Sequence, residues 1–80
     1  MLDDEKLLKI PNINSVKLYA DLSTFPAIVI DLVIDDFNFT VIDNVRTKVS
    51  KIIDRKYKLY GISKKRGRIE LIYFVGDESE

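Results

Sequence analysis

The stretch Ala27-Ile28-Val29-Ile30-Asp31-Leu32-Val33-Ile34-Asp35, together with residues 38–57, decides the fold, because the spacing of apolar residues changes between the two segments. In residues 27–35 one face is wholly apolar, with Ile28, Ile30, Leu32 and Ile34, and half of the other face is also apolar. The density of β-branched residues predicts a strand. In residues 38–57 the apolar residues recur at helical spacing, which predicts an amphipathic helix. The residues on its apolar side are Val41, Ile42, Val45, Val49, Ile52 and Ile53.

Two N-terminal caps are consistent with this helix. Thr40-Val41-Ile42-Asp43 matches a capping box. Asn38 is an equally good cap, and Phe37 could then pack against Ile42 as a hydrophobic staple. Basic residues near the predicted C-terminal end suit the helix dipole.

The remaining elements come from shorter patterns. Residues 3–10 predict a short helix, and residues 15–22 alternate as a half-buried strand before a turn at 23–26. Residues 59–63, with Tyr60 and Ile62 aligned, and residues 68–75 predict two further strands. Between them, Ser63-Lys64-Lys65-Arg66-Gly67 predicts a hairpin tip in which Gly67 is the permissive turn residue.

The element order is therefore (α)ββαββ, which predicts an α+β fold. We expect an antiparallel four-stranded sheet with one main helix packed on one face, in the strand order 1-2-4-3. With 80 residues, the chain has room for a single domain over 1–80, and residues 76–80 form an acidic tail.

The composition excludes several classes of chemistry. The chain has no Cys and no His, so it lacks thiol nucleophiles, disulfides and the commonest general base and metal ligands. Asp31 and Asp35 share a strand face, but their backbones lie about 13 Å apart, which is too far to share one metal ion. We expect no enzyme activity, no cofactor and no metal site.

The chain also lacks the features of a targeting segment. Its first residues are acidic, and its most apolar stretch, at 25–34, is only about half the length of a membrane-spanning helix. We expect a cytoplasmic protein that does not insert into a membrane.

Charge is strongly segregated, although thirteen basic residues balance thirteen acidic ones. Residues 44–68 carry ten of the basic residues and one acidic residue, which predicts a surface for a polyanion. Tyr57 and Tyr60 lie nearby in sequence and could stack on bases. The alternative is that these side chains only keep the hairpin and helix soluble. The candidate nucleic-acid-binding residues are Lys64, Lys65, Arg66 and Arg68 of the hairpin, and Lys51, Arg55 and Lys58 of the helix face.

The predicted sheet face away from the helix is rich in apolar residues. A soluble monomer seldom leaves such a patch exposed. Either Leu7, Leu8 and Ile10 of the N-terminal segment cover it, or it is a protein–protein contact, most simply in a C2 homodimer. The candidate interface residues are Tyr19, Val29, Val33, Ile72 and Phe74.

One family has a similar arrangement. Leu7-Leu8-x-Ile10-Pro11-x-Ile13 precedes the first strand, and Ile28–Asp35 follows it. The helix then has apolar positions at Val41, Val45, Val49 and Ile52/Ile53, before a final strand. This arrangement resembles the α-β-β-α-β cytoplasmic domain of cation-diffusion-facilitator transporters, and ring-building domains of secretion systems share the same spacing. The resemblance implies this fold and dimerisation. It implies no metal ligands here, because that family's sites depend on His.

We therefore expect a small non-enzymatic domain that acts in protein–protein interaction or assembly, as a homodimer or with another protein. The alternative is a nucleic-acid-binding module that uses the basic hairpin tip and the basic helix face. The two functions can coexist, since a dimer would double the basic surface.

Overall fold

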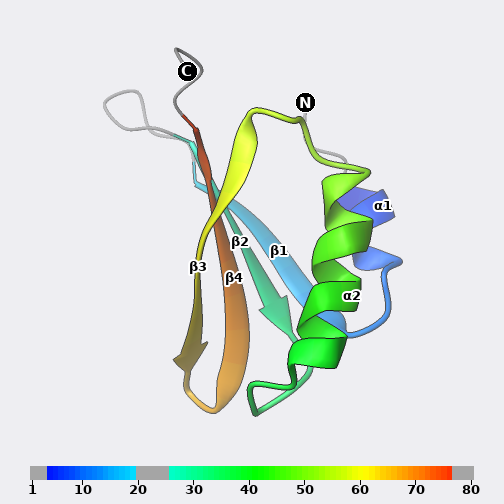
Figure 1. The fold of residues 1–80 in the computed structure, drawn as a ribbon, viewed down its shortest axis with the longest axis vertical. Helices are drawn as coiled ribbons and strands as arrows, with labels where there is room; N and C mark the ends of the chain where they lie inside the picture. Colours follow the sequence, from blue (N-terminus) through cyan, green and yellow to red (C-terminus); the bar gives the residue numbers. More distant parts are fainter. Residues whose placement is uncertain (1–3, 20–25, 77–80) are drawn as a thin grey trace.

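The computed structural model describes residues 4–19 and 26–76, which form two helices and four strands (Figure 1). In chain order the elements are α1 (Asp4–Leu8), β1 (Ile13–Tyr19), β2 (Ala27–Leu32), α2 (Phe39–Ser50), β3 (Tyr57–Lys65) and β4 (Arg68–Val75). None of the helices in these segments is long and apolar enough to cross a membrane.

All four strands form one antiparallel sheet in the order β1-β2-β4-β3. This confirms the predicted fold class and strand order. The order follows from the residues, because β2 and β4 are the most apolar strands and take the two central positions. β1 and β3 carry more polar residues and form the edges.

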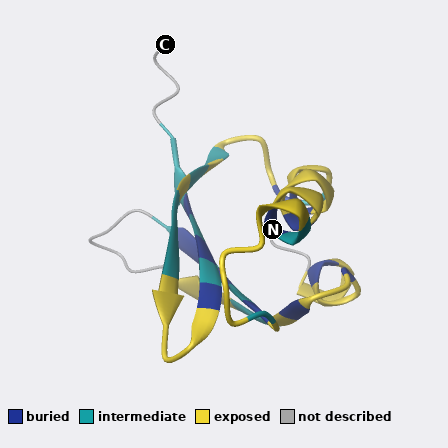
Figure 2. Ribbon diagram, turned by 60° about the horizontal axis from the view of Figure 1, so that its bottom comes forward, coloured by how far each residue is buried: buried dark blue, intermediate teal, exposed yellow. Residues whose placement is uncertain are grey.

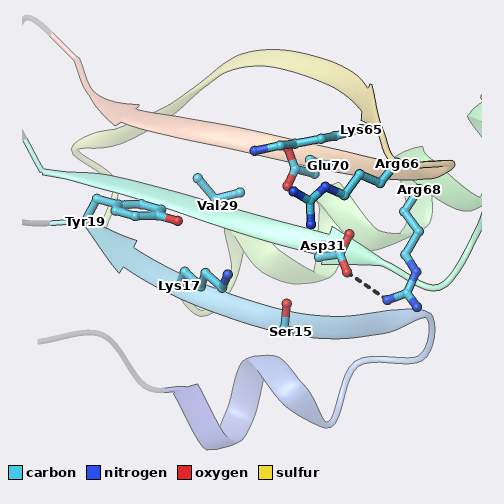
Figure 3. A pocket seen from close by; sticks show the side chains of 9 residues that line it. All are labelled: Ser15, Lys17, Tyr19, Val29, Asp31, Lys65, Arg66, Arg68 and Glu70. Carbon is cyan, nitrogen blue, oxygen red and sulfur yellow. Dashed lines mark hydrogen bonds and ion pairs between the residues drawn. The ribbon is translucent and has the colours of Figure 1, made fainter.

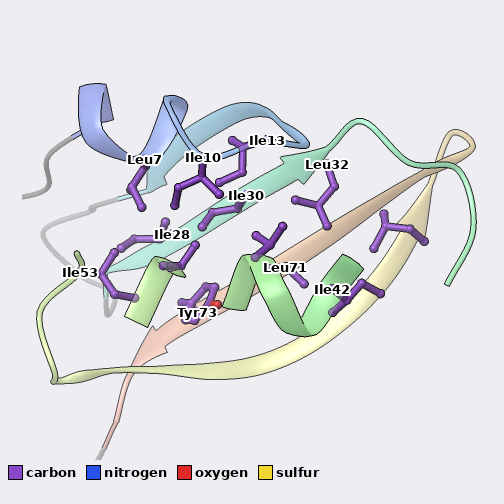
Figure 4. Packing of buried hydrophobic residues seen from close by; sticks show 13 residues of the cluster. Leu7, Ile10, Ile13, Ile28, Ile30, Leu32, Ile42, Ile53, Leu71 and Tyr73 are labelled. Carbon is purple, nitrogen blue, oxygen red and sulfur yellow. The ribbon is translucent and has the colours of Figure 1, made fainter. Parts of the chain in front are cut away.

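The core lies between α2 and one face of the sheet, here called the inner face (Figure 4). Ile28, Ile30 and Leu32 of β2 are fully buried there, and alternate residues of β4 join them. Val45 and Val49 of α2 pack against these strands. Residues between these positions point to the opposite side, here called the outer face, because successive side chains of a strand alternate.

The N-terminal segment packs on the inner face, beside α2 (Figures 1 and 2). Leu7 and Ile10 belong to the same buried cluster as the residues of α2 and β2, whereas Leu8 is half exposed. The prediction that this segment could cover the outer face is therefore wrong. The physical reason is that the inner face of β1 and β2 extends beyond α2, and Leu7 and Ile10 fill that remaining space.

The N-terminal end of α2 is capped by Asn38. Its side-chain Oδ1 accepts a hydrogen bond from the backbone N–H of Val41 at 3.2 Å. The ring of Phe37 stacks on that of Phe39, with centroids 6.2 Å apart. Of the two caps that the sequence allows, the structure therefore has Asn38.

The prediction that the helix continues to residue 57 is wrong. The helix ends at Ser50, because the N–H of Lys51 bonds to the carbonyls of Lys48 and Val49 and tightens the last turn. Asp54 then accepts a hydrogen bond from the backbone N–H of Lys56 at 3.0 Å, which favours a turn over a helix. Ile53 still reaches the core from this loop, which explains why the apolar pattern extends past the end of the helix.

The β3–β4 hairpin is longer than predicted and closes with a two-residue turn. Lys65 pairs with Arg68, and Arg66 and Gly67 between them both have positive φ, at 53° and 80°. This is the geometry that matches the twist of a hairpin. The predicted role of Gly67 is confirmed, and Arg66 shares it.

Other boundaries shift by a few residues. β2 ends at Leu32 rather than residue 35, so Val33 lies beyond it. The end of the strand predicted at 15–22, most of the turn at 23–26 and the acidic tail after residue 76 lie outside the described residues.

Candidate binding face of the sheet

The outer face of the sheet is built from three rows of cross-strand neighbours. The first row is Tyr19, Ala27, Phe74 and Lys58; the second is Lys17, Val29, Ile72 and Gly61; the third is Ser15, Asp31, Glu70 and Ser63. Each row crosses the sheet from β1 to β3. The face therefore changes along the strands, from aromatic and apolar residues at one end to charged residues at the other.

An apolar patch lies on the β3–β4 side of this face, and it consists of Tyr60, Ile72 and Phe74. The register of β3 is interrupted between Leu59 and Gly61, which leaves Tyr60 as an extra residue. Its ring packs edge-on against Phe74, with centroids 4.9 Å apart and planes at 89°. Tyr60 is 75% exposed, whereas Ile72 and Phe74 are half-buried. This patch therefore offers two aromatic rings and one aliphatic side chain to a partner.

Tyr60 was missed as part of this face, because the sequence pattern aligns it with Ile62. In the structure Ile62 packs toward the core with Leu59, and the extra residue places Tyr60 on the other side. A bulge changes the alternation of a strand, and Gly61, a glycine inside a strand pattern, is the residue in the sequence that could have marked this one.

A basic groove occupies the β1–β2 side of the same face and continues to the hairpin (Figure 3). It is an open hollow of about 400 Å³. Lys17 lies on β1, Lys65 and Arg66 at the end of the hairpin, and Arg68 at the start of β4. The remaining lining residues are Ser15, Tyr19, Val29, Asp31 and Glu70.

Within the groove, Asp31 is already engaged by neighbouring side chains. One of its oxygens accepts a hydrogen bond from Asn14 at 2.9 Å and an ion-pairing hydrogen bond from Arg68 at 3.2 Å. Among residues 4–19 and 26–76, no ion pair involves Lys17, Lys65 or Arg66. The groove therefore holds three cations whose charge no neighbouring carboxylate in these segments compensates directly.

The structure separates the two basic sets that the sequence suggested as one surface. Lys65, Arg66 and Arg68 lie in or beside the groove, and the hairpin also carries Lys64. The C-terminal end of α2 and the β3–β4 turn lie at opposite ends of the molecule (Figure 1), and Lys51 and Arg55 follow α2 in the chain. Lys58 lies at the start of β3, seven residues or about 23 Å along the strand from Lys65. The shared helix face does not exist, because α2 ends before Lys51.

The predicted interface residues are divided in a similar way. Ile72 and Phe74 belong to the apolar patch, while Tyr19 and Val29 line the groove. Val33 is 62% exposed beyond the end of β2. Lys17 was not singled out from the sequence, although its alternation with Val16 and Leu18 already placed it on this face.

A second hollow lies between α2 and β3, and Tyr73 contributes to its wall. Burial raises the pKa of the Tyr73 phenol to about 12, while the positive charge of Arg46 opposes the rise. Arg46 itself pairs with Asp43 at 3.5 Å, one turn away on α2. This side of the domain therefore contains a buried neutral phenol beside an exposed ion pair.

Within the part of the chain that the structure describes, no group of three or more acidic residues could hold a metal ion. Compared with protein-family models, with curated proteins and with solved structures, the chain matches none of them. The function therefore has to be inferred from the sheet face itself.

Proposed function

We propose that this domain is a non-enzymatic cytoplasmic assembly module that binds a second copy of itself through the apolar patch on the outer sheet face. The observation that carries the proposal is the position of the two helices. Both pack on the inner face, and no described segment packs over Tyr60, Ile72 and Phe74. Leu7 and Ile10, which could have covered this patch and removed the need for a partner, are buried on the other side of the sheet.

A second copy is the simplest occupant, since a C2 contact places the same patch on both sides. The patch of one chain would then meet Phe74 and Tyr60 of the other, and aromatic pairs favour such edge-to-face contacts. A chain of 80 residues buries a modest fraction of its surface on folding, so association adds apolar burial that one chain cannot supply. Dimerisation is also what the resemblance to the transporter domain implies.

The test is light scattering coupled to size-exclusion chromatography over a range of protein concentrations. We expect a mass of two chains for the wild-type protein and of one chain for Phe74→Asp. Thr47→Asp, on the exposed side of α2, is the matched control and should remain dimeric. Tyr60→Asp is a second interface variant that changes a more exposed residue, so it is less able to disturb the fold.

Circular dichroism establishes that each variant is folded before its mass is interpreted. A wild-type monomer at every concentration would overturn the proposal. A dimer that persists in folded Phe74→Asp and Tyr60→Asp would show that the contact lies elsewhere.

A further inference from the structure

We propose that the basic groove binds single-stranded nucleic acid, with phosphates at its cationic end and a base stacked on Tyr19. This function is distinct from self-association: the groove and the apolar patch have no residue in common, although Val29 of the groove is the cross-strand neighbour of Ile72 of the patch. It also differs from a surface made of the hairpin and the helix, which the positions of Lys51 and Arg55 exclude.

The charges of the groove favour an anion with several negative groups. Lys17, Lys65 and Arg66 come from β1 and from the hairpin, nearly fifty residues apart in sequence, and they line one hollow. They carry no ion pair within the described segments, while Arg68 and Asp31 largely compensate each other. Among the described residues Glu70 is the one further carboxylate in the lining, so the cations outnumber it three to one. Phosphates of a nucleic-acid backbone match such an arrangement, because Lys and Arg neutralise them by charge and by direct hydrogen bonds.

The aromatic residue distinguishes a single strand from a simple polyanion. Tyr19 lies at the end of the groove away from Arg66, and 55% of its surface is exposed (Figure 3). Val29 lies between them on the floor. An exposed tyrosine ring on an open sheet is a stacking surface for an unpaired base, and such stacking is tolerant of sequence. In a duplex the bases are already stacked, so Tyr19 would have no base to contact.

The dimensions of the groove agree with this assignment. A hollow of about 400 Å³ is large enough for a small-molecule ligand, which typically needs ~300–1,000 Å³. The groove therefore has room for one or two nucleotides. Its open side would let the strand continue in both directions.

The test is fluorescence anisotropy with labelled oligo-dT and oligo-U at low and high salt. We expect binding to weaken steeply with salt, and the triple variant Lys17→Glu/Lys65→Glu/Arg66→Glu to lose at least about tenfold in affinity. Tyr19→Ala should lose about tenfold, the effect of removing one stacked base, whereas Tyr19→Phe should retain binding. Lys17→Gln/Lys65→Gln is a milder variant that should weaken binding in the same direction if the charge reversals disturb folding.

The matched control is Lys48→Glu/Lys51→Glu/Arg55→Glu, which makes the same charge change at the other end of the domain. It should leave affinity within about twofold of the wild type after the general effect of net charge is reduced by moderate salt. Three results would overturn the proposal: equal loss in this control, equal affinity for poly-glutamate, or no binding of either oligonucleotide at low salt.

The same samples separate this proposal from self-association. The groove variants should keep the oligomeric mass of the wild-type protein, and Phe74→Asp should keep its affinity for the oligonucleotide. If a groove variant loses its oligomeric mass together with its affinity for the oligonucleotide, the groove is not separate from the self-association surface, and the proposal is contradicted.

Discussion

Leu71 and Ile72 are neighbours on β4, yet their side chains have different surroundings. Leu71 is fully buried beneath α2, whereas Ile72 is half-buried on the outer face beside Phe74. Both are large aliphatic residues in one central strand, so the difference comes from which face the helices cover. Among the described residues, burial is therefore decided by the placement of α1 and α2 on the inner face.

The largest expected contrast is between truncations at these two positions. Leu71→Ala should lower the free energy of unfolding by about 2–5 kcal/mol, because it leaves a cavity in the packed core. Ile72→Ala should cost about 1 kcal/mol, since its side chain is partly exposed. Urea denaturation at one low protein concentration measures both. Equal losses would mean that the outer face is as closely packed as the inner one.

Alkaline titration tests the inner face in a different way. The pKa of Tyr73 is raised from an ordinary 10.0 to about 12, so the folded state favours the neutral phenol. The neutral Tyr73 phenol contributes fully to the free energy of unfolding below pH 10. This contribution is lost as the pH rises from 10 toward 12, and the full loss is about 2–3 kcal/mol.

Tyr73→Phe should remove this part of the alkaline loss, whereas Tyr60→Phe on the outer face should retain it. Urea midpoints measured at a series of alkaline pH values make the comparison. An unchanged alkaline loss in Tyr73→Phe would assign it to other groups.

The helix that closes the inner face depends on its cap. Asn38→Ala should cost about 1 kcal/mol of stability, because the N–H of Val41 loses its side-chain acceptor. Thr40→Ala is the control for the capping box that the structure does not use, and it should change stability little. Thermal unfolding of the two variants decides between them. A larger effect at Thr40 would contradict the observed cap.

The smallest contrast compares two glycines of the β3–β4 hairpin. Gly67 has a φ of 80°, so Gly67→Ala should cost about 1 kcal/mol through backbone strain. Gly61 has no positive φ, and a methyl group added there would meet no atom within 4 Å, so Gly61→Ala should stay within about 0.5 kcal/mol of the wild type. Chemical denaturation curves resolve the difference, and equal effects would contradict the turn geometry.

Much of the architecture could be predicted because it depends on periodicity. The alternation in β2 and β4 identifies the inner face, and the same reasoning gives the strand order. The end of α2 could not be predicted in this way, since Ile53 remains in the core from a loop and continues the helical pattern. Local hydrogen bonds at Lys51 and Asp54 decide the boundary, and they depend on geometry rather than on hydrophobicity.

The candidate site was predicted only in part, for a related reason. The hairpin cations and the outward residues of β2 and β4 were identified from the sequence. The meeting of Lys17 with Lys65 and Arg66 depends on strand register and on how far the hairpin reaches across the sheet. The separation of Lys51 and Arg55 from them follows from the early end of α2, which the apolar pattern conceals.

The register interruptions at the two sheet edges limit how copies of this chain can assemble. Asn14 is the extra residue in β1, and Tyr60 is the extra residue in β3. Neither edge strand therefore offers an unbroken ladder of backbone groups along its whole length. Strand-by-strand addition, which builds fibrils, requires such a ladder. Lys64 and Lys65 add charge repulsion to the end of β3. These edges therefore disfavour open-ended polymers, and any association through the flat of the sheet would stop at a closed pair.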